Sequence, residues 1–297
     1  MTRIDTLLEA AANAARDESA SPAERAEMLM ELAMGLQRRP GTREHLESAL
    51  HLYGEALALC PPAEALLAAR IAARRATALQ ALPGEDHSAI EEARAAFESV
   101  LPVLARSGTP AELAEAEMNH GVCLQHLAAA GRARMADAVA AYQRALRTFE
   151  AKRYPAEFAI LQNNLATAFL SMSSPLREAM AVQCFEQGLK AVSLIDHPVE
   201  HAMLQNNLGN ALQSIASSHA LENHVRALAA YDEALRVRTR EARPVEHANT
   251  LANKASCLWS LGRQDEARAC YDEARRIFSA HGEHQRASAV AEAMEAG

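Results

Sequence analysis

Residues 244–278 read PVEHANTLANKASCLWSLGRQDEARACYDEARRIF, and the opening phrase of this stretch recurs along the chain. The phrase is Pro, then Ala or Val, then Glu, and its successive prolines lie 40, 48, 45, 43 and 46 residues apart. A period of this size is typical of a helical hairpin that is repeated and stacked into a solenoid. The phrase occurs at Pro22-Ala23-Glu24, Pro62-Ala63-Glu64, Pro110-Ala111-Glu112, Pro155-Ala156-Glu157, Pro198-Val199-Glu200 and Pro244-Val245-Glu246.

Each phrase is predicted to begin the first helix of a repeat. Proline suits the first helical position because the N–H that it lacks would be unpaired there anyway. The glutamate falls in the first turn, where its charge meets the positive end of the helix dipole. In Ser21…Glu24 and Thr109…Glu112 the residue before the proline also predicts a capping box.

A second helix in each repeat carries its own signature: an alanine, an aromatic residue four positions later, and a small residue three positions after that. These steps keep all three residues on one helical face. We therefore expect the ring to fill the core, while the small residues admit a neighbouring helix. The signatures are Ala49/Tyr53/Ala56, Ala93/Phe97/Val100, Ala138/Tyr142/Ala145, Ala181/Phe185/Gly188, Ala227/Tyr231/Ala234 and Ala267/Tyr271/Ala274.

The composition narrows the class of protein. The 297 residues are 49% hydrophobic and carry a net charge of −8 without a basic stripe, so nucleic acid is not an expected partner. No apolar run is long enough to span a membrane, and the acid-containing N-terminus does not resemble a signal peptide. Five cysteines without CxxC spacing predict reduced thiols in a cytoplasmic protein.

The predicted fold is all-α, one solenoid of about six helical hairpins with a capping helix at each end. The caps would hide the apolar faces of the terminal repeats. The expected parts are an N-terminal cap over 1–20, repeats over 21–61, 62–109, 110–154, 155–197, 198–243 and 244–283, and a C-terminal cap over 284–297.

The last repeat resembles the tetratricopeptide repeat family in Ala255, Leu258, the Gly262 turn, and then Ala267, Tyr271 and Ala274. The resemblance covers residues 21–283, with longer loops in the first five units. It departs from the family pattern at Lys254, where Leu is usual, and in lacking the usual Trp early in the first helix. The phrases Asn163-Asn164-Leu165-Ala166 and Asn206-Asn207-Leu208-Gly209 are similar to a variant seen in kinesin-light-chain-type and bacterial tetratricopeptide proteins.

This resemblance implies a right-handed superhelix whose first helices line a concave groove that holds a partner peptide or helix. Four repeats place an Asn two residues before the small helix-crossing residue: Asn119, Asn164, Asn207 and Asn253. Carboxamides can donate to and accept from a peptide backbone without demanding a sequence. They could equally bond the adjacent helix and hold the repeat geometry. Family register also points Asn163, Asn206, Asn210, Gln162 and Gln205 toward the groove.

Basic residues mark the first two repeats. Arg38, Arg70 and Arg74, together with Asn119, resemble part of the carboxylate clamp of chaperone-binding tetratricopeptide domains. That resemblance implies an acidic segment docking at this end.

The sequence nominates no catalytic residue, metal ligand or cofactor site. His120, His126, His201 and His247 lie on first helices, but no pair has metal-ligand spacing with a supporting carboxylate, so they are predicted to be surface histidines. No nucleophile elbow, phosphate loop or zinc motif occurs.

The leading hypothesis is therefore a non-catalytic scaffold or adaptor that binds a protein or peptide partner in the groove. An accessory factor for assembling a larger enzyme complex and a peptide-sensing regulator are the alternatives. Self-association through the terminal helices is a further hypothesis.

Overall fold

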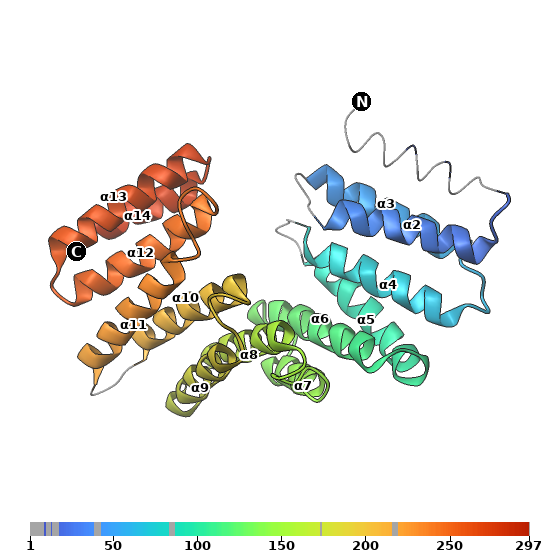
Figure 1. Ribbon diagram of the computed structural model, residues 1–297, viewed down its shortest axis with the longest axis horizontal. Helices are drawn as coiled ribbons and strands as arrows, with labels where there is room; N and C mark the ends of the chain where they lie inside the picture. The colour runs from blue at the N-terminus through green and yellow to red at the C-terminus, as the bar shows by residue number, and fades with distance from the viewer. Residues whose placement is uncertain are drawn as a thin grey trace. The chain divides into compact units, whose positions relative to one another are not determined.

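The structure is a computed structural model that describes residues 9, 13, 18–38, 43–82, 87–172, 174–215 and 219–296. Every regular element of these residues is an α-helix, so the predicted all-α repeat fold is confirmed (Figure 1). The N-terminal cap expected over 1–20 lies almost wholly outside the described residues. Among the described helices, none combines the length and apolar character needed to span a membrane.

The chain divides into two compact units, Met1–Thr148 and Phe149–Gly297. The first unit contains α2 (Pro22–Gln37), α3 (Arg43–Leu59), α4 (Ala65–Gln80), α5 (Ser88–Ser107), α6 (Pro110–Ala129) and α7 (Met135–Ala145). The second contains α8 (Pro155–Leu170), α9 (Pro175–Ala191), α10 (Pro198–Ser214), α11 (Ala220–Leu235), α12 (Pro244–Ser260), α13 (Gln264–Ala280) and α14 (His284–Ala296).

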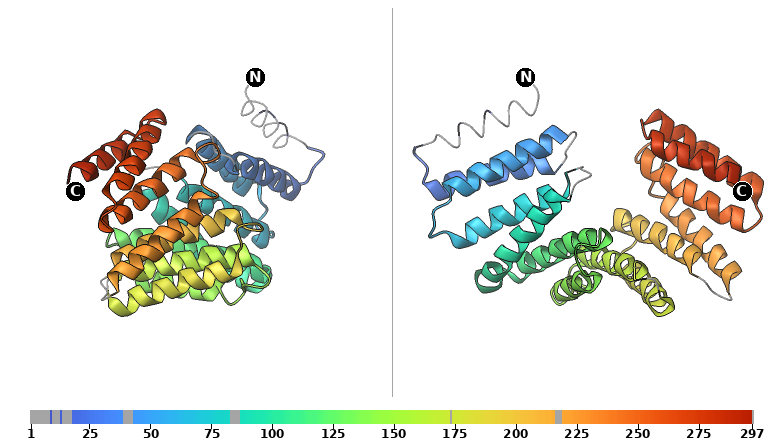
Figure 2. Two further views of the ribbon diagram at one scale, coloured as in Figure 1. Left: turned by 60° about the vertical axis from the view of Figure 1, so that its left-hand side comes forward. Right: turned by 180° about the vertical axis from the view of Figure 1, so that it is seen from behind.

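Both units are built from packed helix pairs. In the first unit these are α2–α3, α4–α5 and α6–α7, and in the second they are α8–α9, α10–α11 and α12–α13 (Figure 2). Within each unit, the second helix of a pair also contacts the first helix of the next pair. The first helices α8, α10 and α12 contact one another in sequence, and α14 packs against α13. This arrangement brings polar side chains of successive first helices within reach of each other.

Helix starts follow the local sequence, with one exception. Five of the six repeated prolines begin a helix, and the capping boxes at Ser21 and Thr109 are both formed. The prediction for Pro62 is wrong, because α4 begins three residues later, at Ala65. Pro61 precedes Pro62, and a residue before proline is biased away from helical geometry. The segment forms a turn instead, in which the Glu64 N–H donates to the Pro61 carbonyl at 2.9 Å.

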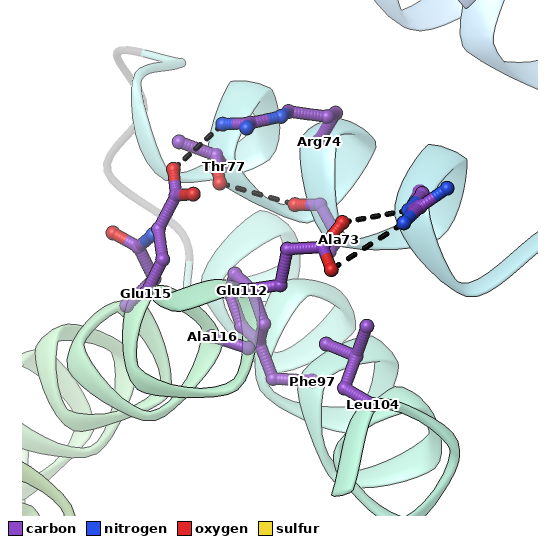
Figure 3. A pocket seen from close by; sticks show the side chains of 10 residues that line it. Ala73, Arg74, Thr77, Phe97, Leu104, Glu112, Glu115 and Ala116 are labelled. Atoms are coloured by element: carbon purple, nitrogen blue, oxygen red, sulfur yellow. Dashed lines mark hydrogen bonds and ion pairs between the residues drawn. The ribbon is translucent and has the colours of Figure 1, made fainter. Parts of the chain in front are cut away.

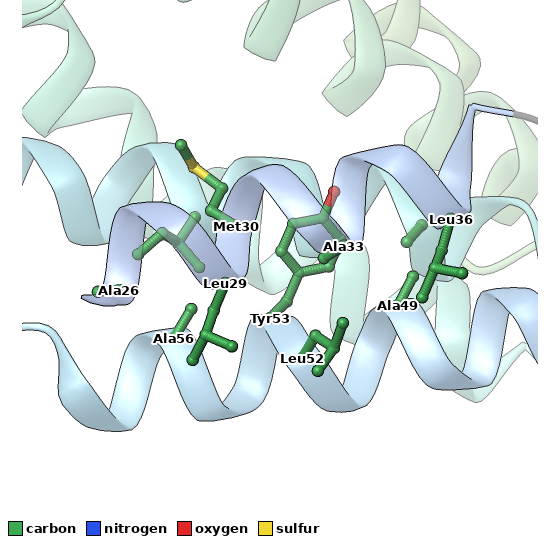
Figure 4. Close-up of a cluster of buried hydrophobic side chains, with 11 residues drawn as sticks. Ala26, Leu29, Met30, Ala33, Leu36, Ala49, Leu52, Tyr53 and Ala56 are labelled. Atoms are coloured by element: carbon green, nitrogen blue, oxygen red, sulfur yellow. The ribbon is translucent and has the colours of Figure 1, made fainter. Parts of the chain in front are cut away.

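The aromatic signature residues lie in the core as predicted. Tyr53 is fully buried between α2 and α3, together with Leu29, Leu52 and small alanines (Figure 4). The other five rings of the signature are at most 6% exposed. At Gly209 the packing requires glycine, because a Cβ there would lie 2.6 Å from Tyr231 Cε1.

Candidate functional site

A chain of hydrogen-bonded carboxamides crosses the first helices of the second unit. Asn253 Nδ2 on α12 donates to Asn206 Oδ1 on α10 at 3.3 Å, and Asn206 Nδ2 donates to Asn207 Oδ1 at 3.0 Å. Asn207 Nδ2 then donates to Asn163 Oδ1 on α8 at 2.7 Å, and Asn163 Nδ2 donates to Asn164 Oδ1 at 3.3 Å. We call these five side chains the amide relay. All its bonds run in the same direction, from α12 to α8.

The two ends of the amide relay retain hydrogen-bonding capacity. Asn164 Nδ2 has no acceptor among the described residues, and Asn253 Oδ1 has no donor there. Asn163 and Asn206 are buried, whereas Asn164, Asn207 and Asn253 are half-buried and reachable from solvent. The relay therefore presents a donor at one end and an acceptor at the other.

Both interpretations of the asparagines have physical support. The cross-helix bonds give the relay a structural role, since they tie α8, α10 and α12 together. An amide carries two donors and an acceptor with two lone pairs. Each relay amide therefore keeps capacity beyond the bonds that it makes. Binding by these residues stays a prediction.

The stretches of α8 and α10 that carry the relay contain no charged side chain. Residues 158–170 of α8 and residues 202–214 of α10 contain no Asp, Glu, Lys or Arg. Three apolar residues that precede the relay asparagines on the same helices are half-buried: Phe158, Ile160 and Met203. An uncharged wall of amides and apolar groups suits an uncharged ligand surface such as a peptide backbone.

Three of the amides predicted in the second unit lie outside the relay. Gln162 is buried and donates to Gln187 Oε1 on α9 at 3.4 Å, so it faces its own hairpin. Asn210 Oδ1 accepts from the Tyr231 hydroxyl at 2.7 Å, which holds α10 to α11. Gln205 is half-buried, and no hydrogen bond of its side chain to a relay residue is formed.

Of the four asparagines at equivalent repeat positions, Asn119 belongs to the first unit. It is half-buried on α6, and its backbone carbonyl accepts from Gln80 Nε2 at 2.6 Å. Its side chain lines a pocket between α4 and α6 whose far wall includes Phe97 and Leu104 of α5 (Figure 3).

The predicted cations of that pocket are already paired. Arg70 Nε donates to Glu112 Oε1 at 2.6 Å, and Arg74 Nη1 donates to Glu115 Oε1 at the same distance (Figure 3). The hydrogen bond from Arg70 is the main cause that lowers the pKa of the Glu112 carboxyl. Arg38 is the C-cap residue of α2, where its backbone N–H donates to the Met34 carbonyl. An acidic ligand would therefore have to compete with carboxylates of the chain itself.

One of the predicted surface histidines is not on the surface. His120 is only 8% exposed, and neither ring nitrogen has a hydrogen-bond partner. The Glu98 carboxylate lies 3.6 Å from its Nε2, yet burial is the larger effect and lowers the pKa of the ring. The sequence prediction missed this because His120 directly precedes Gly121, where α6 crosses Tyr142 closely.

The remaining histidines differ in exposure. His126 is exposed, whereas His201 and His247 are half-buried. The His247 Nδ1 lies 2.6 Å from the Arg238 carbonyl. Within the described part of the chain, no group of three His, Cys, Asp or Glu side chains could hold a metal ion.

Sequence reasoning also missed Thr250, which supports the relay. This fully buried residue of α12 places its Oγ1 3.1 Å from Asn206 Oδ1 and 2.9 Å from the Glu246 carbonyl. The equivalent positions of α8 and α10 are Leu161 and Leu204. A threonine at a position where α8 and α10 have leucine was the sequence signal that could have identified this residue.

The family comparison places tetratricopeptide repeats in the second unit. The tetratricopeptide repeat model matches residues 200–280, and the resemblance of the chain to that family is confirmed. The match runs from within α10 to the end of α13 and includes the whole phrase Asn206-Asn207-Leu208-Gly209, which carries the second Asn pair. A comparison with curated proteins finds no match.

Solved structures share the fold at low identity. Pseudomonas aeruginosa PilF is 17% identical with a TM-score of 0.58, and the alignment covers 89% of this chain and 96% of PilF. The apo form of the quorum sensor NprR from B. thuringiensis is 15% identical with a TM-score of 0.65, covering 86% and 66%. The nearly identical tetratricopeptide-like repeats of a Podospora anserina protein assigned as a kinesin light chain are 17% identical with a TM-score of 0.51, covering 71% and 95%.

Proposed function

We propose that this protein is a non-catalytic interaction module that binds an extended polypeptide segment along the amide relay of its second unit. The relay would hold the segment mainly through its backbone. Asn164 Nδ2 would donate to a backbone carbonyl, and Asn253 Oδ1 would accept from a backbone N–H. The single observation that carries the proposal is the relay itself, with its open donor and acceptor ends.

Three features support a polypeptide ligand. The relay amides are fixed by their mutual bonds, which lowers the entropy lost when a ligand binds. The flanking residues of α8 and α10 carry no charge. The half-buried Phe158, Ile160 and Met203 add apolar contact area for side chains of the partner.

The test uses peptides selected on the full-length protein from a random twelve-residue display library. Asn164→Asp is the diagnostic variant, because it keeps the oxygen that accepts from Asn163 and replaces the free N–H donor by a negative charge. We expect it to weaken the selected peptides at least tenfold in fluorescence anisotropy. Asn223→Asp, the same change on α11, is the matched control and should bind normally. Equal affinities of the two variants, or failure to select any peptide, would contradict the proposal.

The proposed binding mode fits the roles already named. We propose scaffold or adaptor as the role, with assembly factor as the alternative. A peptide-sensing regulator has one specific support, the shared fold with the quorum sensor NprR. A peptide-dependent change in the scattering radius of the full chain would favour it, and an unchanged radius would favour a scaffold. The free thiols of all five cysteines support a reducing, cytoplasmic setting.

A further inference from the structure

The loop that joins α11 to α12 contains four arginines, and only one of them lacks a carboxylate partner. Arg236 pairs with Glu233 at 2.9 Å, Arg240 with Glu273 at 3.5 Å, and Arg243 with Glu246 at 3.4 Å. For Arg238, no carboxylate oxygen of the described residues lies within 4.0 Å.

Arg238 replaces a buried apolar residue of the other repeats. It lies six residues before Pro244, and the residues six positions before Pro110, Pro155 and Pro198 are Leu104, Phe149 and Val192. Those three are at most 5% exposed, and Leu104 lines the pocket between α4 and α6. A guanidinium in a register that otherwise packs apolar side chains is costly to desolvate, so its presence calls for a partner.

The Arg238 side chain reaches the amide relay. Its Nη1 donates to Thr250 Oγ1 at 3.1 Å, and this hydroxyl lies 3.1 Å from Asn206 Oδ1. The guanidinium thus stands at the seam between α10 and α12, one hydroxyl away from the centre of the relay. The Arg238 side chain is half-buried. Its N–H groups that make no hydrogen bond are not fully enclosed, so a ligand can reach them.

The local charge matches a single carboxylate. Glu246 and Arg243, the two charged groups that shift the pKa of Arg238, pair with each other at 3.4 Å, so Arg238 leaves one uncompensated positive charge. Burial lowers the pKa of the guanidinium, while Glu246 raises it. Arginine remains protonated in proteins and binds carboxylates through parallel N–H donors. A phosphate carries close to two negative charges and would leave this site over-compensated.

We propose that Arg238 is an anion subsite that binds one carboxylate of the polypeptide held by the amide relay. The carboxylate is either an Asp or Glu side chain or the C-terminal carboxylate of the partner. This inference rests on the proposed function, because it supplies a charge-selective anchor to an otherwise backbone-reading surface.

The experiment uses peptides selected on the wild-type chain, each made in two altered forms. One form replaces acidic side chains by their amides, and the other has an amidated C-terminus. We expect one of these forms to bind the wild-type at least tenfold more weakly, and that form identifies the source of the carboxylate. The Arg238→Gln variant should bind the unaltered peptide and this weakened form with equal affinity. Arg240→Gln, the same change two residues away on an exposed arginine, is the control and should behave as wild-type.

Each outcome separates this inference from the proposed function. Peptides that bind the wild-type without any dependence on their carboxylates would overturn the Arg238 subsite and leave the relay proposal standing. The same follows if the carboxylate dependence persists in Arg238→Gln. Failure to select any peptide would overturn both proposals. If Arg238→Gln does not fold, Arg238→Lys keeps the charge but loses the planar fork, and the subsite predicts a reduced yet measurable carboxylate dependence.

Discussion

At the scale of single residues, Asn206 is the centre of the proposed binding surface. It accepts from Asn253, lies within hydrogen-bond distance of Thr250, and donates to Asn207. It is also only 6% exposed. Leaving buried polar groups unpaired is more costly than the net value of one hydrogen bond. Asn206 should therefore matter for stability, whereas the relay ends should matter for binding.

Asn206→Ala is expected to lower the free energy of unfolding by about 1–3 kcal/mol, because it strips an acceptor from Thr250 and Asn253. Urea unfolding followed by circular dichroism measures the change. Asn164→Ala removes only the terminal bond of the relay and should cost less. A larger loss for Asn164→Ala than for Asn206→Ala would contradict this ranking.

His120 gives the first unit a predicted pH dependence. Burial lowers the pKa of its ring below the usual value of 6.5, against the opposing effect of Glu98 and Glu117, while Arg144 lowers it further. The unfolded chain therefore binds a proton that the folded chain resists as the pH falls below about 6.5. This contribution to stability is complete above that pH and declines below it.

Replacing His120 by Gln should flatten the loss of stability between pH 7.5 and pH 5.5, as measured by urea unfolding at both values. The same change at the exposed His126 of the same helix, His126→Gln, is the matched control. The lowered pKa of Glu112 acts in a lower window, where its contribution is lost as the carboxyl is protonated below its usual 4.5. An unaltered slope in His120→Gln would show that other groups govern this range.

At the scale of elements, two helices approach a tyrosine ring so closely that the contact requires glycine. A Cβ on Gly121 or Gly209 would lie 2.5 or 2.6 Å from the ring of Tyr142 or Tyr231. The Tyr231 ring in turn places its hydroxyl between Asn210 and Gln213. A shift of this ring would therefore disturb both packing and hydrogen bonding in the α10–α11 pair.

Gly209→Ala should destabilise the chain by about 1–3 kcal/mol, the usual cost of overpacking a core. Gly54→Ala is the matched control within α3, because a Cβ there meets nothing within 4 Å. That control should gain up to about 1 kcal/mol from higher helix propensity. Thermal unfolding of the two variants compares them directly, and a neutral Gly209→Ala would mean that Tyr231 can relax at little cost.

Local sequence patterns predicted most of the helices and their buried faces. The features that they did not predict depend on contacts between helices. The capping boxes and the buried rings follow from residues three or four positions apart, which the sequence places on one face. Pro62 failed because a neighbouring proline changed the backbone. The ion pairs of Arg70 and Arg74, the burial of His120 and the role of Arg238 depend on residues from other helices. The sequence spacing of these residues does not show which side chains of two different helices lie opposite each other.

At the scale of the whole molecule, the two units present different chemistry to a partner. In the first unit, Arg70 and Arg74 of α4 pair with Glu112 and Glu115 of α6. The second unit carries the uncharged amide relay, and beside it the Arg238 guanidinium has no carboxylate oxygen within 4.0 Å among the described residues. Exposed ion pairs contribute little to stability and are weakened by salt. Binding to the relay should accordingly depend on salt only through Arg238.

The most direct test of the account follows the side-chain amide signals of Asn164 and Asn253 by nuclear magnetic resonance while a selected peptide is added to the full chain. The account predicts that the chemical shifts of the Asn164 Hδ2 and Asn253 side-chain amide signals change as peptide is added. Fitting these changes should give the same dissociation constant as anisotropy. Signals that stay fixed while the peptide saturates the protein would contradict recognition by the amide relay.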